Sequence, residues 1–306
     1  MSRAERRRAR RQAAGRTGSQ AAGRPAETAR SAARRVPPTA RGGNRSIWSG
    51  PLPILVALLA VGLLITGFVV YTRSQAGGQH PGQESADGSS VVAKLSGVRP
   101  ALLDQVGAGG TKSTLKAISG PPLTGNGGRP QILYIGAEYC PYCAAERWSL
   151  TVALSRFGRL QGVKLTRSGS TDVFPDTATL SFSQATYVSS YIDFVAVETA
   201  DRQGQPLQSP SAQQQQLLTT HGGGSIPFLD FAGQRVQIGS GFPPDVLANR
   251  SQDEIASSMT AGDGPLAQTV LGHANVLTAA ICGSTAGQPA EVCGSAGVKA
   301  ADQQLR

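Results

Sequence analysis

The pattern of apolar and polar positions changes character along the chain. Residues 1–46 hold too few apolar side chains for a core, whereas Leu52 to Tyr71 is an apolar run of twenty residues without a charge. Residues 75–90 are polar and rich in Gly and Ser, and periodic apolar patterns begin near Val91. We therefore expect a disordered Arg-rich arm over 1–46, a transmembrane helix over 50–72, a flexible linker over 73–90, a folded domain over 91–298 and a C-terminal tail over 299–306.

Within the folded domain, the apolar positions follow the period of strands in some segments and of helices in others. The predicted strands are short and rich in β-branched or aromatic residues: 116–118, 131–135, 163–167, 179–182, 191–198, 226–231 and 235–238. The predicted helices are 99–106, 141–157, 212–220, 251–259 and 265–281. The last two strands form a hairpin around Gly233. This mixture predicts an α/β domain.

The apolar run is long enough to cross a bilayer, because twenty helical residues at about 1.5 Å each span its ~30 Å hydrocarbon layer. A cleaved signal peptide is the alternative, and residues 72–76 leave it open. Four arginines (Arg34, Arg35, Arg41 and Arg45) precede the run, and Arg73 lies close behind it. The positive-inside rule then places the N-terminus in the cytoplasm and the folded domain outside the cell membrane.

The net charge of +10 belongs to the arm and not to the folded domain. Residues 1–46 carry thirteen Arg and two Glu, which leaves 16 basic and 17 acidic residues in the rest of the chain. A nucleic-acid partner is therefore not expected for the domain. We interpret the arm as a topology anchor that is attracted to anionic lipid headgroups.

The four cysteines form two pairs, and all of them follow the apolar run. Cys140 and Cys143 form a C-x-x-C motif where the predicted strand 131–135 gives way to a helix. The helix N-terminus stabilises a thiolate at Cys140, and Cys143 can resolve a mixed disulfide by attacking Cys140. Pro141 restrains this turn and leaves no N–H unsatisfied. The motif predicts a catalytic dithiol that uses no cofactor other than itself.

Other roles for the cysteines stay open. A zinc site is disfavoured because Cys282 and Cys293 are separated by ten residues, and a purely structural Cys140–Cys143 disulfide would close a very small loop. Cys282 and Cys293 flank a Gly- and Pro-containing loop and predict a structural disulfide, with an electron-relay pair as the alternative. We expect no metal ligands among the scattered His80, His221 and His273, although His221 could approach the dithiol.

The run from Ile132 to Cys143 resembles the first catalytic strand and active-site turn of the thioredoxin superfamily, with the Pro-Tyr dipeptide of glutaredoxins. Ser225-Ile226-Pro227 resembles the cis-proline loop of that fold, and the resemblance implies that Ile226 and Pro227 dock the substrate chain beside the dithiol. It also implies that Tyr139, Pro141 and Tyr142 border the substrate site.

This sequence differs from the thioredoxin pattern at one site residue and by one longer segment. Tyr134 stands where thioredoxins carry a buried acid that assists proton transfer, so Glu138 or Glu146 would have to take that role or simply be solvated. The segment over 158–224 is longer than the connection that a minimal thioredoxin has here. Its length predicts an insertion between the dithiol helix and the cis-proline strand.

Residues 91–298 as a whole resemble a family of membrane-anchored, thioredoxin-like proteins classed as a domain of unknown function. The residues that carry this likeness are Gly136 to Trp148, Ser225 to Phe228 and Ile281 to Cys293. The resemblance implies a thioredoxin-like central sheet flanked by helices.

The function that we expect is thiol–disulfide exchange on exported proteins by an enzyme anchored in the cell membrane through residues 52–71. An oxidase, an isomerase and a reductase use the same exchange chemistry, so the direction stays open. A reductase would receive its electrons from a redox partner in the membrane. The alternatives are a thioredoxin-fold binding or assembly module without redox turnover and a Cu(I)-handling chaperone, since soft thiolates bind Cu(I).

Overall fold

A mixed five-stranded sheet lies at the centre of residues 87–306, which are the part of the chain that the computed structural model describes. Its strand order is β1-β9-β8-β2-β7, with β2 parallel to β7 and antiparallel to β8. The five strands are β1 (Lys116–Ala117), β2 (Gln131–Gly136), β7 (Asp193–Glu198), β8 (Phe228–Phe231) and β9 (Arg235–Ile238).

Two small antiparallel sheets accompany the central one in the described residues. They pair β3 (Gly158–Gln161) with β6 (Thr186–Ser189), and β4 (Lys164–Arg167) with β5 (Ala178–Ser181). All four strands lie between the dithiol helix and β7. The predicted insertion over 158–224 is therefore built mainly from these two sheets, whereas its remaining elements join the central layers.

The helices differ greatly in length, from one turn to more than five. They are α3 (Ser89–Ser96), α4 (Pro100–Val106), α5 (Pro141–Ser155), α6 (Ala212–Gly222), α7 (Gln252–Ala261), α8 (Gly264–Ser284), α9 (Ala290–Cys293) and α10 (Ala296–Asp302). Within residues 87–306 there are also three short 3-10 segments, η1 (Asn126–Gly128), η2 (Pro244–Leu247) and η3 (Gln303–Leu305).

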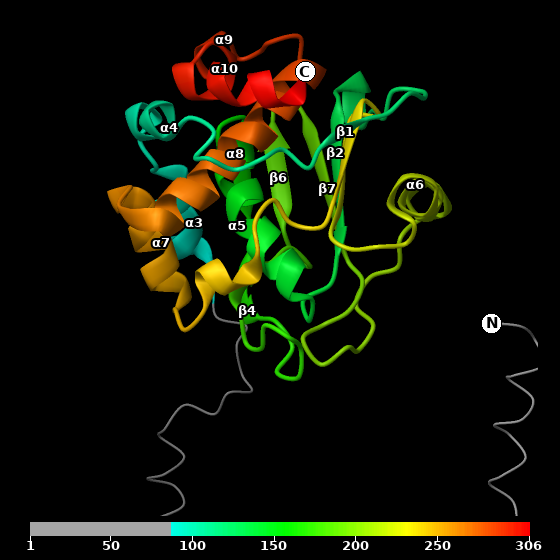
Figure 1. The fold of residues 1–306 in the computed structure, drawn as a ribbon. Coiled ribbons are helices and arrows are strands. Elements are labelled where there is room, and N and C mark those ends of the chain that lie inside the picture. The colour runs from blue at the N-terminus through cyan, green and yellow to red at the C-terminus, as the bar shows by residue number, and fades with distance from the viewer. Residues whose placement is uncertain (1–86) are drawn as a thin grey trace, which may run out of the picture. The chain divides into compact units, whose positions relative to one another are not determined.

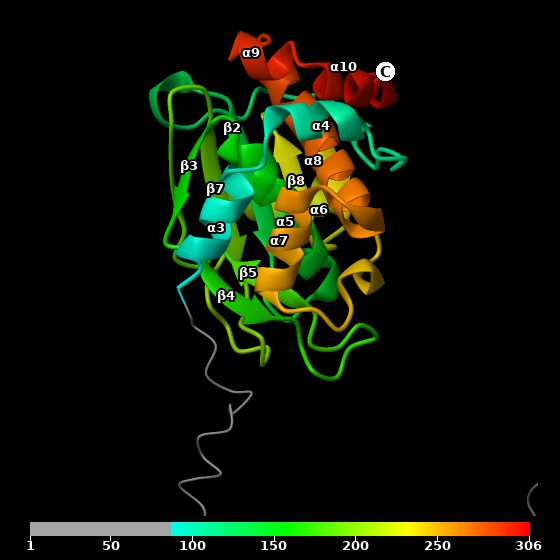
Figure 2. The ribbon, with the colours of Figure 1, turned by 90° about the vertical axis from the view of Figure 1, so that its left-hand side faces the viewer.

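The two faces of the central sheet bury separate hydrophobic cores. In β2 successive side chains point to opposite faces, so Ile132 and Tyr134 join the larger core while Leu133 and Ile135 join the smaller one. The larger core is covered by α3, α5, α7 and α8, and α6 lies on the other side of the sheet (Figure 1). Figure 2 shows the same helix layer in front of the strands.

Helix α8 is long and apolar enough to cross a membrane, but the structure gives it another role. The most apolar 18-residue stretch of α8 is 83% buried inside the domain, and the helix packs along α5. It is therefore the central helix of the larger core. The transmembrane helix predicted over 50–72 and the arm over 1–46 lie outside the described residues, as does most of the linker over 73–90.

The elements predicted inside the domain are confirmed, with ends that differ by a few residues. The ends of the domain differ from expectation. Helix α3 begins at Ser89, inside the predicted linker, and buries Val91 and Leu95. At the other end α10 runs to Asp302 and Leu305 is buried, so the expected tail over 299–306 packs onto the domain instead. Strands β3 and β6 were not predicted.

Candidate active site

Cys140 lies between the end of β2 and the start of α5. Strand β2 ends at Gly136, and a short turn closed by a hydrogen bond from the Cys140 N–H to the Ala137 carbonyl (3.2 Å) leads into the helix. Cys140 is the N-cap of α5, with extended backbone angles, and Pro141 is the first helical residue. The thiol thus stands among the unpaired N–H groups of a helix N-terminus.

The two thiols of the motif are free in this structure and have different environments. The Cys140 side chain is 7% exposed and its Sγ accepts the backbone N–H of Cys143 at 3.3 Å, whereas Cys143 is fully buried. The hydrogen bond from the Cys143 thiol, joined by backbone N–H groups and the charge of Arg147, lowers the pKa of Cys140 to about 7 against the effect of burial. Burial raises the pKa of Cys143 well above its usual range. Of the two thiols, Cys140 therefore forms the thiolate more readily, and Cys143 keeps its proton more tightly.

A buried ion pair lies behind the dithiol. The Arg147 guanidinium, one helical turn after Cys143, binds both oxygens of Glu198 on β7 (Nε–Oε1 2.8 Å, Nη2–Oε2 2.7 Å), and neither side chain is exposed. Arg147 Nη2 also donates to the Ala137 carbonyl in the turn before Cys140, at 2.8 Å. The guanidinium thus holds a positive charge that lowers the pKa of both thiols. This pair was not predicted from the sequence, although two adjacent charges in an otherwise apolar helix were a signal for it.

Tyr134 is buried beside the ion pair and holds its proton more tightly than an exposed tyrosine. The ring is fully buried, with the Arg147 guanidinium 5.7 Å from its centroid. Its hydroxyl has no hydrogen-bond partner within the described part of the chain, and burial raises its pKa well above the usual range.

The two carboxylates that were weighed for proton transfer are both engaged elsewhere. Glu138 is half-buried and accepts the hydroxyl of Ser181 on β5. Glu146 is fully buried, with both oxygens 3.0 Å from His273 Nε2 on α8 and one of them accepting the Gly241 N–H at 3.0 Å. Neither residue is freely solvated.

The residues expected to border the substrate site lie together at the end of β2, in the interior of the sheet. Because β8 runs antiparallel to β2 with Phe228 opposite Ile135, Pro227 lies level with the end of β2, where the turn to Cys140 begins. The Ile226–Pro227 peptide bond is cis, Ile226 is partly exposed and Pro227 is buried.

The active-site turn itself presents aromatic side chains to solvent. Tyr139 is 39% exposed and Tyr142 is 41% exposed, while Pro141 is buried. The Tyr142 ring stands edge-to-face with Phe174, their centroids 5.9 Å apart.

The other predicted residues lie on other elements. His221 is on α6, across the sheet from α5, and its charge acts on Asp230. Cys282 and Cys293 form a disulfide that joins α8 to α9. Helix α9 lies at the top of Figures 1 and 2, whereas β4 and β5, which contact the first half of α5, lie at the bottom.

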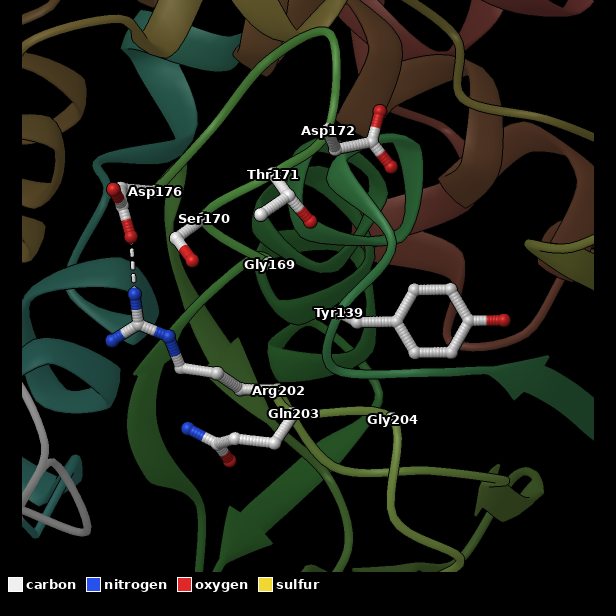
Figure 3. A pocket seen from close by; sticks show the side chains of 9 residues that line it. All are labelled: Tyr139, Gly169, Ser170, Thr171, Asp172, Asp176, Arg202, Gln203 and Gly204. Carbon is white, nitrogen blue, oxygen red and sulfur yellow. Dashed lines mark hydrogen bonds and ion pairs between the residues drawn. The ribbon is translucent and has the colours of Figure 1, made fainter. Parts of the chain in front are cut away.

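A cavity of about 670 Å³ opens beside Tyr139 (Figure 3). Its walls are Tyr139, the loop between β4 and β5 over 169–172 with Asp176, and the loop over 202–204 that follows β7. Arg202 pairs with Asp176 across this cavity. This cavity was not predicted from the sequence, since the three segments that line it are far apart in the chain.

One family model matches part of the chain, and its description is a domain of unknown function (DUF929). The match covers residues 115–221, from β1 to α6, so it includes the dithiol, the two small sheets and Glu198 but ends before Pro227. No curated protein and no solved structure matches the chain.

Proposed function

We propose that this protein catalyses thiol–disulfide exchange on exported proteins through Cys140 and Cys143. The observation that carries the proposal is the asymmetry of the two thiols: Cys140 caps a helix with a pKa of about 7, and Cys143 is buried and protonated behind it. This is the arrangement that an attacking thiol and a resolving thiol require.

The chemistry balances with these two groups alone. The Cys140 thiolate attacks one sulfur of a substrate disulfide, which forms a mixed disulfide and releases the other sulfur as a thiolate that takes up a proton from water. Cys143 then attacks Cys140, the bond from Cys140 to the substrate breaks, and the Cys143 proton passes to the departing sulfur. The substrate is reduced and the protein is left with a Cys140–Cys143 disulfide. The reverse sequence oxidises a substrate dithiol.

A thioredoxin-like fold is part of the proposal. It is supported by the strand order β9-β8-β2-β7, by the parallel β2–β7 pair with α5 between these strands in the sequence, and by the antiparallel β8 and β9. Helix α6 precedes β8 and α8 follows β9. The Ile226–Pro227 segment then borders the substrate, beside the dithiol turn.

The proposed location is the outer side of a cell membrane, with residues 52–71 as a single span. The apolar run and the arginines before it support this topology. The Cys282–Cys293 disulfide supports an oxidising compartment.

The test compares the purified full-length protein with its Cys140→Ser variant in insulin reduction and in the refolding of reduced ribonuclease. Exchange predicts activity in at least one assay for the wild type and none for the variant. Equal results for the two proteins would leave a binding module without redox turnover as the function. The Cys143→Ala variant should accumulate mixed disulfides with its substrates, and the Cys140→Ala/Cys143→Ala control should not.

A further inference from the structure

The cavity beside Tyr139 has no part in the bond-making steps at the two thiols, yet one of its walls is the residue next to Cys140 in the chain. Tyr139 immediately precedes Cys140, and the cavity volume of about 670 Å³ lies in the range of sites that bind ligands. A group bound there would therefore be connected to the atom that reacts with Cys140 by only a short length of chain.

The cavity and Pro227 lie on opposite sides of the active-site turn. Strand β2 has β8 as one neighbour and β7 as the other. Pro227 precedes β8, whereas residues 202–204 follow β7, whose end is level with Gly136. A polypeptide that passes over Cys140 from the Pro227 side therefore meets the cavity on the far side.

The walls of the cavity are fixed to the active-site turn by backbone hydrogen bonds. The Gly169 N–H donates to the Tyr139 carbonyl at 2.8 Å, and the Glu138 N–H donates to the Ala200 carbonyl at 2.9 Å. At the base of the β4–β5 loop, Trp148 Nε1 of α5 donates to the Ala178 carbonyl at 3.0 Å. The insertion thus holds the cavity in a constant position relative to Cys140.

The lining is polar and carries an excess negative charge. Ser170 and Thr171 come just before Asp172 in the loop and bring hydroxyl groups, and in the view of Figure 3 they lie between the Asp176 and Asp172 side chains. Asp176 pairs with Arg202, so Asp172 provides the excess among the lining side chains, and Arg167 lies next to them, where it donates to the Asp176 carbonyl at 3.0 Å. The charge of Asp172 also acts on the Tyr139 hydroxyl, where it adds to burial and to the two thiols in raising the Tyr139 pKa.

On the basis of the proposed function, we infer that this cavity binds the residues of a substrate polypeptide next to its reacting cysteine, and that Asp172 makes it prefer a basic side chain there. A basic residue gains attraction to the Asp172 carboxylate, whereas an acidic one is repelled. Asp172 is thus a specificity-determining residue for polypeptide substrates and takes no part in exchange with a small disulfide.

The kinetic test uses two peptides that differ in having Lys or Glu beside a cysteine held as a mixed disulfide with 2-nitro-5-thiobenzoate. The small substrate is 2-hydroxyethyl disulfide. Reduced full-length wild type should react about three- to fivefold faster with the Lys peptide than with the Glu peptide. Asp172→Asn should bring the two rates together and leave the small-disulfide rate unchanged. The matched control, Asp302→Asn on α10, should keep the wild-type preference.

The inference would be overturned if the Asp172→Asn protein still reacted faster with the Lys peptide than with the Glu peptide. It would also be overturned if the substitution lowered the rates with the peptides and with the small disulfide by the same factor. A binding measurement shows whether the assignment of the cavity or the proposed exchange activity has failed. The Cys140→Ser protein is titrated with peptides that carry Ser for Cys, and the Lys peptide should bind more tightly in an Asp172-dependent manner. If the wild type exchanges no disulfide but this binding persists, the exchange proposal fails and the assignment of the cavity stands. If exchange proceeds without any Lys preference, the assignment fails alone.

Discussion

Replacing Cys143 by alanine removes the hydrogen bond that does most to stabilise the Cys140 thiolate. The Cys143 thiol is the leading cause of the lowered Cys140 pKa, which falls from 9.0 to about 7. Two pKa units correspond to about 3 kcal/mol of preferential thiolate stabilisation. Hydrogen bonds to charged groups contribute about 1.5–3 kcal/mol, and an S–H donor is weak, so the lower figure applies. Cys143→Ala should therefore raise the pKa of Cys140 by about one unit.

The rate of alkylation by iodoacetamide measured against pH reports this pKa, because only the thiolate reacts. The rate rises with pH as the proton leaves Cys140. At pH 7 a thiol with a pKa of about 7 is about half ionised, and one unit higher it is about one-tenth ionised. The variant should thus react about fivefold more slowly than wild type at pH 7, with its midpoint near pH 8.

Cys143→Ser is the matched control, since serine keeps a hydrogen-bond donor at the same position. Its midpoint should lie closer to that of wild type than the alanine midpoint does. A wild-type midpoint near pH 9, or identical midpoints in wild type and Cys143→Ala, would refute the account of how the fold activates Cys140.

Three further changes test the packing around the site. Arg147→Met leaves Glu198 buried without its partner and should cost about 3–5 kcal/mol in denaturant unfolding, whereas replacing both residues by apolar ones should cost much less. Replacing Cys282 and Cys293 by serine should lower the free energy of unfolding by about 3 kcal/mol without moving the alkylation midpoint. Gly272→Ala, which would stabilise an ordinary helix, should lower the melting temperature, because the new methyl group would lie 2.6 Å from the loop over 108–109.

The turn that carries Cys140 was predictable because its signals are local. A buried strand, a Gly, a Cys-Pro-Tyr-Cys motif and a helical pattern follow one another within about twenty-five residues, and the structure has β2, the turn and α5 in that order. The hairpin of β8 and β9 was likewise visible from two short strands around a Gly-containing turn.

The electrostatic partners of the dithiol could not be predicted in the same way. Arg147 and Glu198 are 51 residues apart, and Glu146 and His273 are 127 apart, so each pair exists only through the tertiary fold. Glu138 and Glu146 were the expected proton acceptors because they are near Cys140 in the sequence, but the carboxylate paired with Arg147 is Glu198, brought there by the parallel pairing of β7 with β2.

The elements that the sequence analysis missed have weak local patterns. Strands β3 and β6 read Gly-Arg-Leu-Gln and Thr-Tyr-Val-Ser, and their side chains are mostly exposed or half-buried. Helix α3 begins with two serines at the end of a Gly/Ser-rich stretch and was therefore included in the linker. Packing against α5 and α7, rather than helix propensity, accounts for α3.

The reduction potential of the Cys140–Cys143 couple decides whether these two thiols can exchange disulfides with a substrate. The full-length protein is equilibrated in glutathione buffers of graded composition, and the fraction with both thiols free is counted by mass after alkylation. A catalytic dithiol predicts a reversible two-electron transition between about −270 mV, typical of a reductant, and about −120 mV, typical of an oxidant. A disulfide that stays oxidised below about −300 mV, or thiols that never form one, would contradict exchange at this site.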